Sequence, residues 1–198
     1  MTNILITGVA GFIGSNLAEK LLSNKNYNVI GIDNLAYGIK EQIPNGVKFY
    51  NADIRDKSIY PLFTGVDFVF HFAAKNCISD CQLDPLETAN INIYGTINVF
   101  EASRLANVKK VIYAESSAMY EGSLKIPTPE SEVHPQSFYA ISKFSTMLFA
   151  EAYLRFFNLN STALRYFCVY GPRQDYRRIM AVLFYGSLAL VHKRRNIL

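Results

Sequence analysis

The sequence predicts an α/β fold in which a doubly wound parallel sheet carries helices on both faces. Short apolar runs typical of buried parallel strands alternate with longer segments of helical periodicity, and a glycine-rich turn follows the first run. The chain has 198 residues and is 50% hydrophobic, which suffices for one substantial core. We expect a domain at residues 1–175 and an atypical apolar and basic tail at residues 176–198.

Each expected element rests on a local pattern. Short, largely apolar runs, several of them next to Gly, Asp or Asn, predict strands at residues 3–7, 27–33, 47–50, 67–71, 110–114 and 162–166. Apolar residues at helical spacing predict helices at residues 11–22, 57–63, 88–105 and 139–157. A loop that contains Pro135 precedes the last of these helices.

The turn after the first strand has the spacing Gly8-x-x-Gly11-x-x-Gly14. Glycines at such a turn permit backbone bending, close approach of a pyrophosphate and tight packing of helix on strand. The helix that opens at Gly11 would direct its unpaired N–H groups at the phosphates. The turn therefore predicts a dinucleotide site, and an ordinary glycine-rich strand-to-helix turn is the alternative.

Three further polar residues lie at or just after the ends of predicted strands. Asp33 comes about 20 residues after Gly14, the interval expected for an acid that binds the adenosine ribose. Its charge would repel a 2′-phosphate, and residues 34–39 contain no Arg or Lys, so NAD is favoured over NADP. Asp53 could bond the adenine amino group or cap the helix that follows. For His71 we expect a buried imidazole with its hydrogen bonds satisfied.

Tyr139 and Lys143 lie one helical turn apart, and therefore on one helix face. A phenol has a pKa near 10, and we expect the nearby ammonium to lower it. Ser116, at the end of the fifth strand, could hold the substrate oxygen and share its proton. These groups could deprotonate an alcohol while its hydride moves to a nicotinamide. The alternative is a helix with Tyr139 packed and Lys143 solvated.

Composition excludes several classes of protein. The formal charge is +4 and most basic residues are dispersed, so no nucleic-acid surface is expected. Three cysteines form neither a disulfide framework nor a metal-ligand spacing, so no metal is expected. The N-terminus shows no secretory leader, and we expect a cytoplasmic protein. The apolar residues 179–191 are too few to span a bilayer, which needs about 20.

Further motifs make a resemblance plain. They are, in chain order, the glycine turn, Asp33-Asn34-Leu35, Asp53-Ile54-Arg55, His71-Phe72-Ala73-Ala74, Asn92-Ile93-Tyr94-Gly95-Thr96, Ser116-Ser117-Ala118-Met119-Tyr120, residues 139–143, Arg165-Tyr166-Phe167 and Tyr170-Gly171-Pro172-Arg173-Gln174. The chain resembles the extended short-chain dehydrogenases/reductases, in the nucleotide-sugar epimerase/dehydratase group, over almost all of residues 1–175. The resemblance implies a Rossmann fold that binds NAD.

The resemblance also implies roles for individual residues. Ser116, Tyr139 and Lys143 would be catalytic. Ser117 and Cys168 would contact substrate, Cys168 standing where the family usually has an asparagine. The residues implied around the cofactor are Gly8, Gly11, Phe12, Ile13, Gly14, Asp33, Asn34, Asp53, Ile54, Phe72, Ala73, Ala74, Asn90, Lys143 and Tyr166.

The dehydratases of this group carry acidic residues where this chain has Ser117-Ala118, so the resemblance favours a 4-epimerase of a UDP-sugar. Such an enzyme oxidises C4 transiently to a ketone and returns the hydride to the opposite face. Relatives continue into a C-terminal substrate lobe, most of which this chain lacks. An inactive NAD-binding remnant, or a dehydratase or reductase of the family, is the alternative. Relatives dimerise through helices near residues 92–105 and 139–157.

Overall fold

The computed structural model describes residues 1–174. The chain divides into two compact units, Met1–Phe167 and Cys168–Leu198, and the sheet with its helices lies in the first. The expected tail at residues 176–198 lies outside the described residues, so the predicted boundary at residue 175 stays a prediction.

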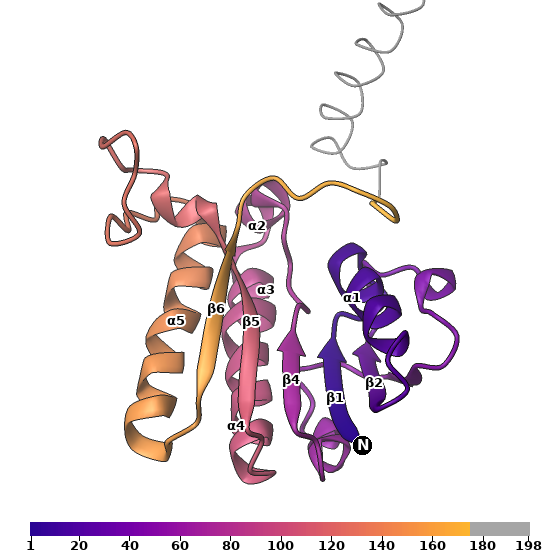
Figure 1. Ribbon diagram of the computed structural model, residues 1–198. Helices are drawn as coiled ribbons and strands as arrows, with labels where there is room; N and C mark the ends of the chain where they lie inside the picture. Colours follow the sequence, from indigo (N-terminus) through magenta and orange to yellow (C-terminus); the bar gives the residue numbers. More distant parts are fainter. Residues whose placement is uncertain (175–198) are drawn as a thin grey trace, which may run out of the picture. The chain divides into compact units, whose positions relative to one another are not determined.

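A six-stranded parallel sheet forms the centre of the first unit (Figure 1). Its strands are β1 (Thr2–Thr7), β2 (Tyr27–Asp33), β3 (Lys48–Asn51), β4 (Phe68–His71), β5 (Lys110–Ser116) and β6 (Ser161–Tyr166). Their order across the sheet is β3-β2-β1-β4-β5-β6. The direction of winding reverses between β1 and β4, and ligands of doubly wound sheets bind at the carboxyl ends of the strands beside such a reversal. The predicted fold class is confirmed.

Apolar side chains cover both faces of the sheet. Because successive side chains of a strand point to opposite faces, Ile4 and Ile6 of β1 pack in one cluster with α1 (Phe12–Leu22), while Leu5 lies in the other. The second cluster is the larger and is covered by α4 (Thr96–Leu105) and α5 (Phe138–Phe157). The sheet is therefore a middle layer.

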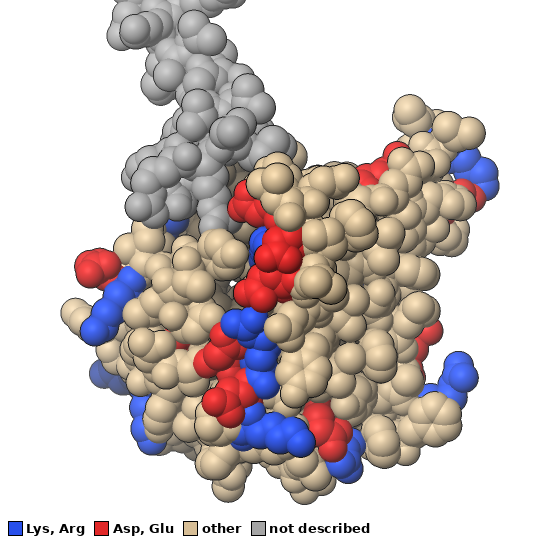
Figure 2. All heavy atoms as spheres, turned by 180° about the vertical axis from the view of Figure 1, so that it is seen from behind, with Lys and Arg blue, Asp and Glu red and all other residues tan. Residues whose placement is uncertain are grey.

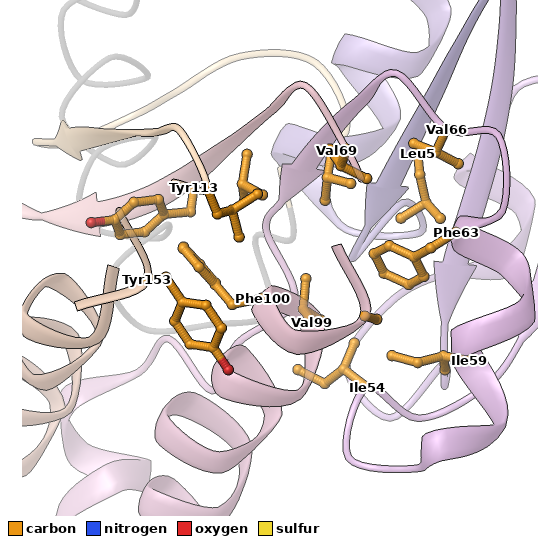
Figure 3. Packing of buried hydrophobic residues seen from close by; sticks show 14 of the residues in the cluster. Leu5, Ile54, Ile59, Phe63, Val66, Val69, Val99, Phe100, Tyr113 and Tyr153 are labelled. Atoms are coloured by element: carbon orange, nitrogen blue, oxygen red, sulfur yellow. The ribbon is translucent and has the colours of Figure 1, made fainter. Parts of the chain in front are cut away.

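Aromatic rings fill the part of the larger cluster beneath α5 (Figure 3). The ring centroid of Phe100 lies 5.5 Å from that of Tyr113 and 5.5 Å from that of Tyr153. These distances are typical of favourable aromatic pairs. The three rings join β5 to both helices, so the strand that ends at Ser116 and the helix that carries Tyr139 share one rigid core.

Two expected helices take a different form. The segment Lys57–Phe63 is a 3₁₀ helix that contains Pro61, which lacks the N–H that an α-helix would use. The expected helix at residues 88–105 is divided: α3 (Pro85–Thr88) leads into a π-helical segment, η3 (Ala89–Gly95), and only then into α4. A short helix that the sequence did not predict, α2 (Ile78–Leu83), precedes them.

Within residues 1–174, no helix is long and apolar enough to cross a bilayer.

Candidate active site

The glycine turn at the end of β1 has no room for larger residues. Gly8 has a positive φ of 74°, and a Cβ there would lie 2.7 Å from the backbone nitrogen of Ala73. A Cβ on Gly14 would lie 2.2 Å from the carbonyl oxygen of Gly8. Because Gly8 has no Cβ, the turn can lie directly against the segment after β4. Because Gly14 has no Cβ, the start of α1 can lie directly against the turn.

The N-terminus of α1 suits an anion. Gly11 is its N-cap residue, and no side chain caps this end. The N–H groups of the first turn, which belongs to Phe12, Ile13 and Gly14, therefore lack the side-chain acceptor that usually satisfies such donors. With the missing Cβ atoms of Gly8 and Gly14, this geometry fits the pyrophosphate of a dinucleotide.

Asp33 lies at the end of β2 and supports the same turn. It is 8% exposed, and its two carboxylate oxygens accept hydrogen bonds from the backbone N–H of Ala10, at 3.0 Å, and of Leu35, at 2.8 Å. Burial raises the pKa of this carboxyl, although both hydrogen bonds oppose the rise. Each carboxylate oxygen can accept a further hydrogen bond, and the binding of ribose hydroxyls by Asp33 stays a prediction.

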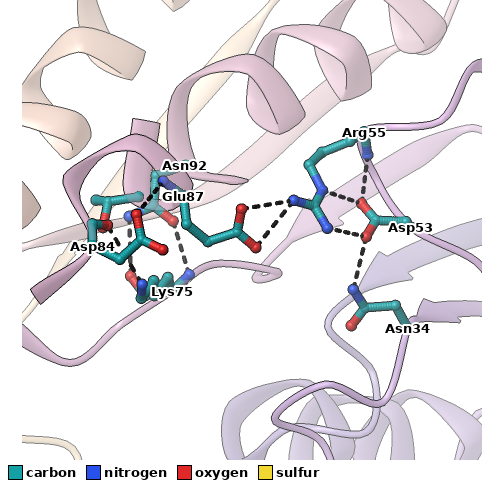
Figure 4. A network of polar contacts seen from close by, with 8 residues as sticks. Asn34, Asp53, Arg55, Lys75, Asp84, Glu87 and Asn92 are labelled. Carbon is teal, nitrogen blue, oxygen red and sulfur yellow. Dashed lines mark hydrogen bonds and ion pairs between the residues drawn. The ribbon is translucent and has the colours of Figure 1, made fainter. Parts of the chain in front are cut away.

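A polar network joins the ends of β2 and β3 to α3 (Figure 4). Asp53 accepts hydrogen bonds from Asn34 at 2.9 Å and from the Arg55 guanidinium at 2.7 Å, and Arg55 continues to Glu87. The bonds from Arg55 lower the pKa of Asp53 to about 2. Asp53 also accepts a hydrogen bond from the backbone N–H of Arg55 at 2.9 Å, but the N-cap of the 3₁₀ helix that follows is Asp56. Whether Asp53 also bonds adenine stays a prediction.

The other residues implied around the cofactor differ in burial and in their distance from the glycine turn. Ile54 packs its side chain in the core, so only its backbone could meet a ligand. Phe72, Ala73 and Ala74 follow β4 next to the glycine turn. Asn90 is exposed on η3.

Asn92, two residues after Asn90, was not singled out from the sequence and is buried. Its side chain binds the backbone N–H of Lys75 at 2.8 Å and carbonyl at 3.0 Å, and it donates to the Ser142 hydroxyl at 3.0 Å (Figure 4). It thereby ties the segment after β4 to α5. Its signal in the sequence was its place in the motif that Gly95-Thr96 completes.

His71 is a satisfied buried imidazole, as expected. Its Nδ1 lies 2.6 Å from the Thr7 hydroxyl and its Nε2 lies 2.9 Å from the Thr96 hydroxyl. Thr7 also accepts a hydrogen bond from the N–H of Ala73. Burial lowers the pKa of His71 to about 3, so the ring is neutral and links β1, β4 and α4 beside the glycine turn.

The catalytic candidates meet where β5 ends and α5 begins. Tyr139 and Lys143 are both buried, and the Ser116 side chain lies close enough to Tyr139 to lower the pKa of its phenol. The Lys143 ammonium donates to the carbonyl oxygen of Ala114 at 2.8 Å. The structure therefore brings Ser116, Tyr139 and Lys143 together, and the alternative of a solvated Lys143 is wrong.

The pKa of Tyr139 is raised in the structure, although the sequence predicts that Lys143 lowers it. Burial raises the pKa of Tyr139, the Ser116 side chain lowers it, and the charge of Glu115 raises it further. The charge that acts on Lys143 most strongly is that of Glu115, which opposes the lowering of the lysine pKa by burial. Glu115 was not singled out from the sequence, because one acid in an apolar strand forms no motif.

Glu121 directly follows the 3₁₀ turn at Ser117–Tyr120. Its carboxylate accepts hydrogen bonds from the N–H of Gln136 at 3.1 Å, and from the N–H and the hydroxyl of Ser137, each at 2.8 Å. Ser137 is the N-cap of α5 and in turn accepts from the N–H of Ala140. Glu121 thus fixes the start of the helix that carries Tyr139, and its negative charge is favourable there.

The remaining predicted residues lie around this end of the sheet or beyond the first unit. Ser117 opens a 3₁₀ turn after β5, and Tyr166, at the end of β6, pairs in register with Ser116. Cys168 belongs to the second unit, so its role stays a prediction. Within residues 1–174, no cluster of His, Cys, Asp and Glu could hold a metal ion.

The sheet order, the glycine turn and the group formed by Ser116, Tyr139 and Lys143 define a Rossmann-type protein of the short-chain dehydrogenase/reductase class. A family model described as the NAD dependent epimerase/dehydratase family matches residues 4–196. The chain belongs to this family, and the prediction of NAD as the cofactor is confirmed.

Individual relatives agree with this. The UDP-glucose 4-epimerase of Mycolicibacterium smegmatis is 34% identical over 96% of this chain and 63% of its own length. The UDP-glucose 4-epimerase of Thermotoga maritima, solved with UDP-glucose, has a TM-score of 0.85 and is 40% identical over 88% of this chain and 58% of its own.

A UDP-N-acetylglucosamine 4-epimerase of Methanobrevibacter ruminantium, solved with UDP-N-acetylmuramic acid, has a TM-score of 0.86 and 32% identity. The match covers 93% of this chain and 63% of that structure. This chain therefore spans about 60% of the length of the relatives it matches.

The neutral state of His71 makes stability depend on pH. The pKa is lower in the folded chain than the ordinary value of 6.5, so the stability from this group is present above pH 6.5 and is lost as the pH falls toward 3. Between pH 7 and pH 4 we expect a loss on the order of 3 kcal/mol in the free energy of unfolding. Urea unfolding at both pH values should show a smaller loss in His71→Gln. The exposed His134 is the control, because His134→Gln should keep the unmodified dependence; equal losses in both variants would contradict this.

Proposed function

We propose that this chain provides the cofactor-binding and catalytic part of a nucleotide-sugar 4-epimerase, with a UDP-hexose as substrate. The observation that carries the proposal is the proximity of Ser116 and Tyr139 to the buried Lys143, at the carboxyl edge of a sheet that also holds the glycine turn. UDP-sugars are the substrate class because two relatives are named as UDP-glucose 4-epimerases and one as a UDP-N-acetylglucosamine 4-epimerase.

Each side chain of the group has a distinct task. Tyr139, as the phenolate, takes the proton of the sugar 4-hydroxyl and later returns it, because its phenol is a titratable group close to the Ser116 side chain. Ser116 holds the sugar oxygen and orients the phenol. Lys143 supplies positive charge that favours the phenolate as the proton moves. NAD, when bound, supplies the acceptor and donor of hydride that converts the C4 alcohol to a ketone and back.

Burial changes the acid–base properties of Tyr139. Because the pKa of the phenol is raised, its phenolate, once formed, is a stronger base toward the sugar hydroxyl. Water is excluded from Lys143, so its charge acts over a short distance in a medium of low polarity. Epimerisation, rather than dehydration, fits Ser117 and Ala118, which carry no carboxyl group that could expel a second hydroxyl.

Tyr139→Phe tests the mechanism. Removing one hydroxyl should lower 4-epimerase turnover on UDP-glucose or UDP-N-acetylglucosamine by about 10²–10⁴-fold, the usual contribution of an acid–base group, while the fold and NAD binding persist. Tyr153→Phe, on the same helix, loses only a hydrogen bond to Glu101 and should retain turnover. Full activity in Tyr139→Phe would contradict the proposal.

Asp33→Asn tests the cofactor site. The amide keeps the shape of the side chain but removes the charge that repels a 2′-phosphate, so NAD should bind more weakly, by about 1.5–3 kcal/mol, and the preference over NADP should shrink. Calorimetric titration with both cofactors measures this. Asp56→Asn, which alters a cap outside the turn, should leave both affinities unchanged. Equal affinity of the unmodified chain for NAD and NADP would refute the role of Asp33.

A homodimer is part of the proposal. α5 exposes an apolar stripe of Ile141, Leu148, Phe149 and Phe156, and Figure 2 shows few charged residues on the side of the molecule that carries α5. A second copy could bury this stripe against its own. Leu148→Glu should shift the sedimenting species to monomer, whereas Leu124→Glu, in a loop and 97% exposed, should not. A monomeric unmodified chain would contradict the dimer.

A further inference from the structure

Glu115 is the most deeply buried acid of the described chain that the mechanism above does not use. It is 2% exposed, at the last position but one of β5, directly before Ser116. Its Oε1 accepts a hydrogen bond from the Thr146 hydroxyl at 2.9 Å. Its Oε2 is buried and has no hydrogen-bond partner among residues 1–174. A buried carboxylate oxygen without a partner is costly and calls for an explanation.

Among residues 1–174, Lys143 is a buried cation without a paired carboxylate, whereas Glu115 is a buried carboxylate with an unpaired oxygen. Its side chain is 6% exposed, and one of its three N–H groups donates to the carbonyl of Ala114. A carbonyl carries no net charge, so it cannot balance the ammonium. A buried lysine without a counter-charge tends to lose its proton, and burial does lower the pKa of Lys143. Lys143 and Thr146 are one turn apart on α5, so the face that bonds Glu115 also carries the ammonium.

Other groups near Glu115 do not serve as its cationic partner. The titratable and charged groups that act on Glu115, or on which it acts, are Lys143 and Tyr139 from α5, Arg165 from β6 and Tyr113 from β5. Arg165 is directed elsewhere, since it donates to the Tyr120 hydroxyl and to the carbonyl of Glu130, both at 2.6 Å. Lys143 additionally faces His71, which is neutral, and the Cys81 thiol.

We propose that Glu115 is a positioning residue, the buried counter-charge that keeps Lys143 protonated and directed at the end of β5 beside Tyr139. This inference rests on the proposed function, in which the Lys143 charge favours the phenolate. Burial raises the pKa of Glu115 to about 7, and the charge of Lys143 opposes that rise. Glu115 therefore becomes charged in the neutral range, so the strength of the pair changes with pH there.

The experiment follows Lys143 directly. In protein labelled with [¹⁵N]lysine, the Nζ resonance that disappears in Lys143→Met reports the protonation of this side chain. In Glu115→Gln, which keeps an acceptor for Thr146 but no charge, the pKa of Lys143 should fall by about 1–3 units, the usual effect of an opposite charge within 4–6 Å. Glu101→Gln, which removes a carboxylate paired with Arg104, should leave Lys143 unchanged. An unchanged Lys143 in Glu115→Gln would overturn the proposal.

The unmodified chain gives a second measurement that does not depend on a variant that folds. With [¹³C]carboxyl glutamate, Glu115 should titrate near pH 7, and the Lys143 Nζ shift should show a step at the same pH. A titration of Glu115 that leaves the Lys143 Nζ shift without a step would overturn the proposal. The two proposals fail separately: full turnover in Tyr139→Phe would remove the mechanism and leave this coupling intact, whereas loss of the coupling would leave the mechanism standing.

Discussion

The site depends on one close approach of backbone to backbone, between the turn after β1 and the segment after β4. Gly8 leaves no space for a side chain against Ala73, and Gly14 leaves none against Gly8. This contact lies where α1 begins, directly after Thr7, which is the register partner of His71 and lies within hydrogen-bond distance of it. The chain of hydrogen bonds from Thr7 through His71 to Thr96 then extends the constraint to α4. The parallel strands place their carboxyl ends at one edge of the sheet, and this contact fixes the positions of the backbone segments at that edge.

Most of the fold could be predicted because buried parallel strands are continuous apolar runs with polar or glycine residues at their ends. The same logic fails for short helices. Lys57–Phe63 has helical periodicity, but Pro61 and its length favour the tighter 3₁₀ form. The π segment at Ala89–Gly95 has no signature of its own, because its residues, such as Asn92 and Tyr94, are also compatible with an ordinary α-helix.

Site residues could be predicted where they recur at fixed spacings in the sequence. They could not be predicted where the role of a single side chain depends on which groups the fold places around it. Tyr139 and Lys143 are one turn apart in any helix, so their proximity follows from the sequence. The dominance of burial over charge at Tyr139 does not, because it depends on how much protein surrounds the phenol. Glu115 and Glu121 are single acids that acquire partners only through the fold, one under α5 and one at its start.

The π segment limits how the chain can change between α3 and α4. Its hydrogen bonds run from residue i to i+5, so it holds one residue more than an α-helix would over the same path. One additional residue in an ordinary α-helix would rotate everything on one side by about 100° relative to the other, and the wide π turn absorbs that residue instead. Asn92 therefore binds Lys75 while Thr96 binds His71. The chain is one residue longer here, and the two side chains still meet partners on the same side of the sheet.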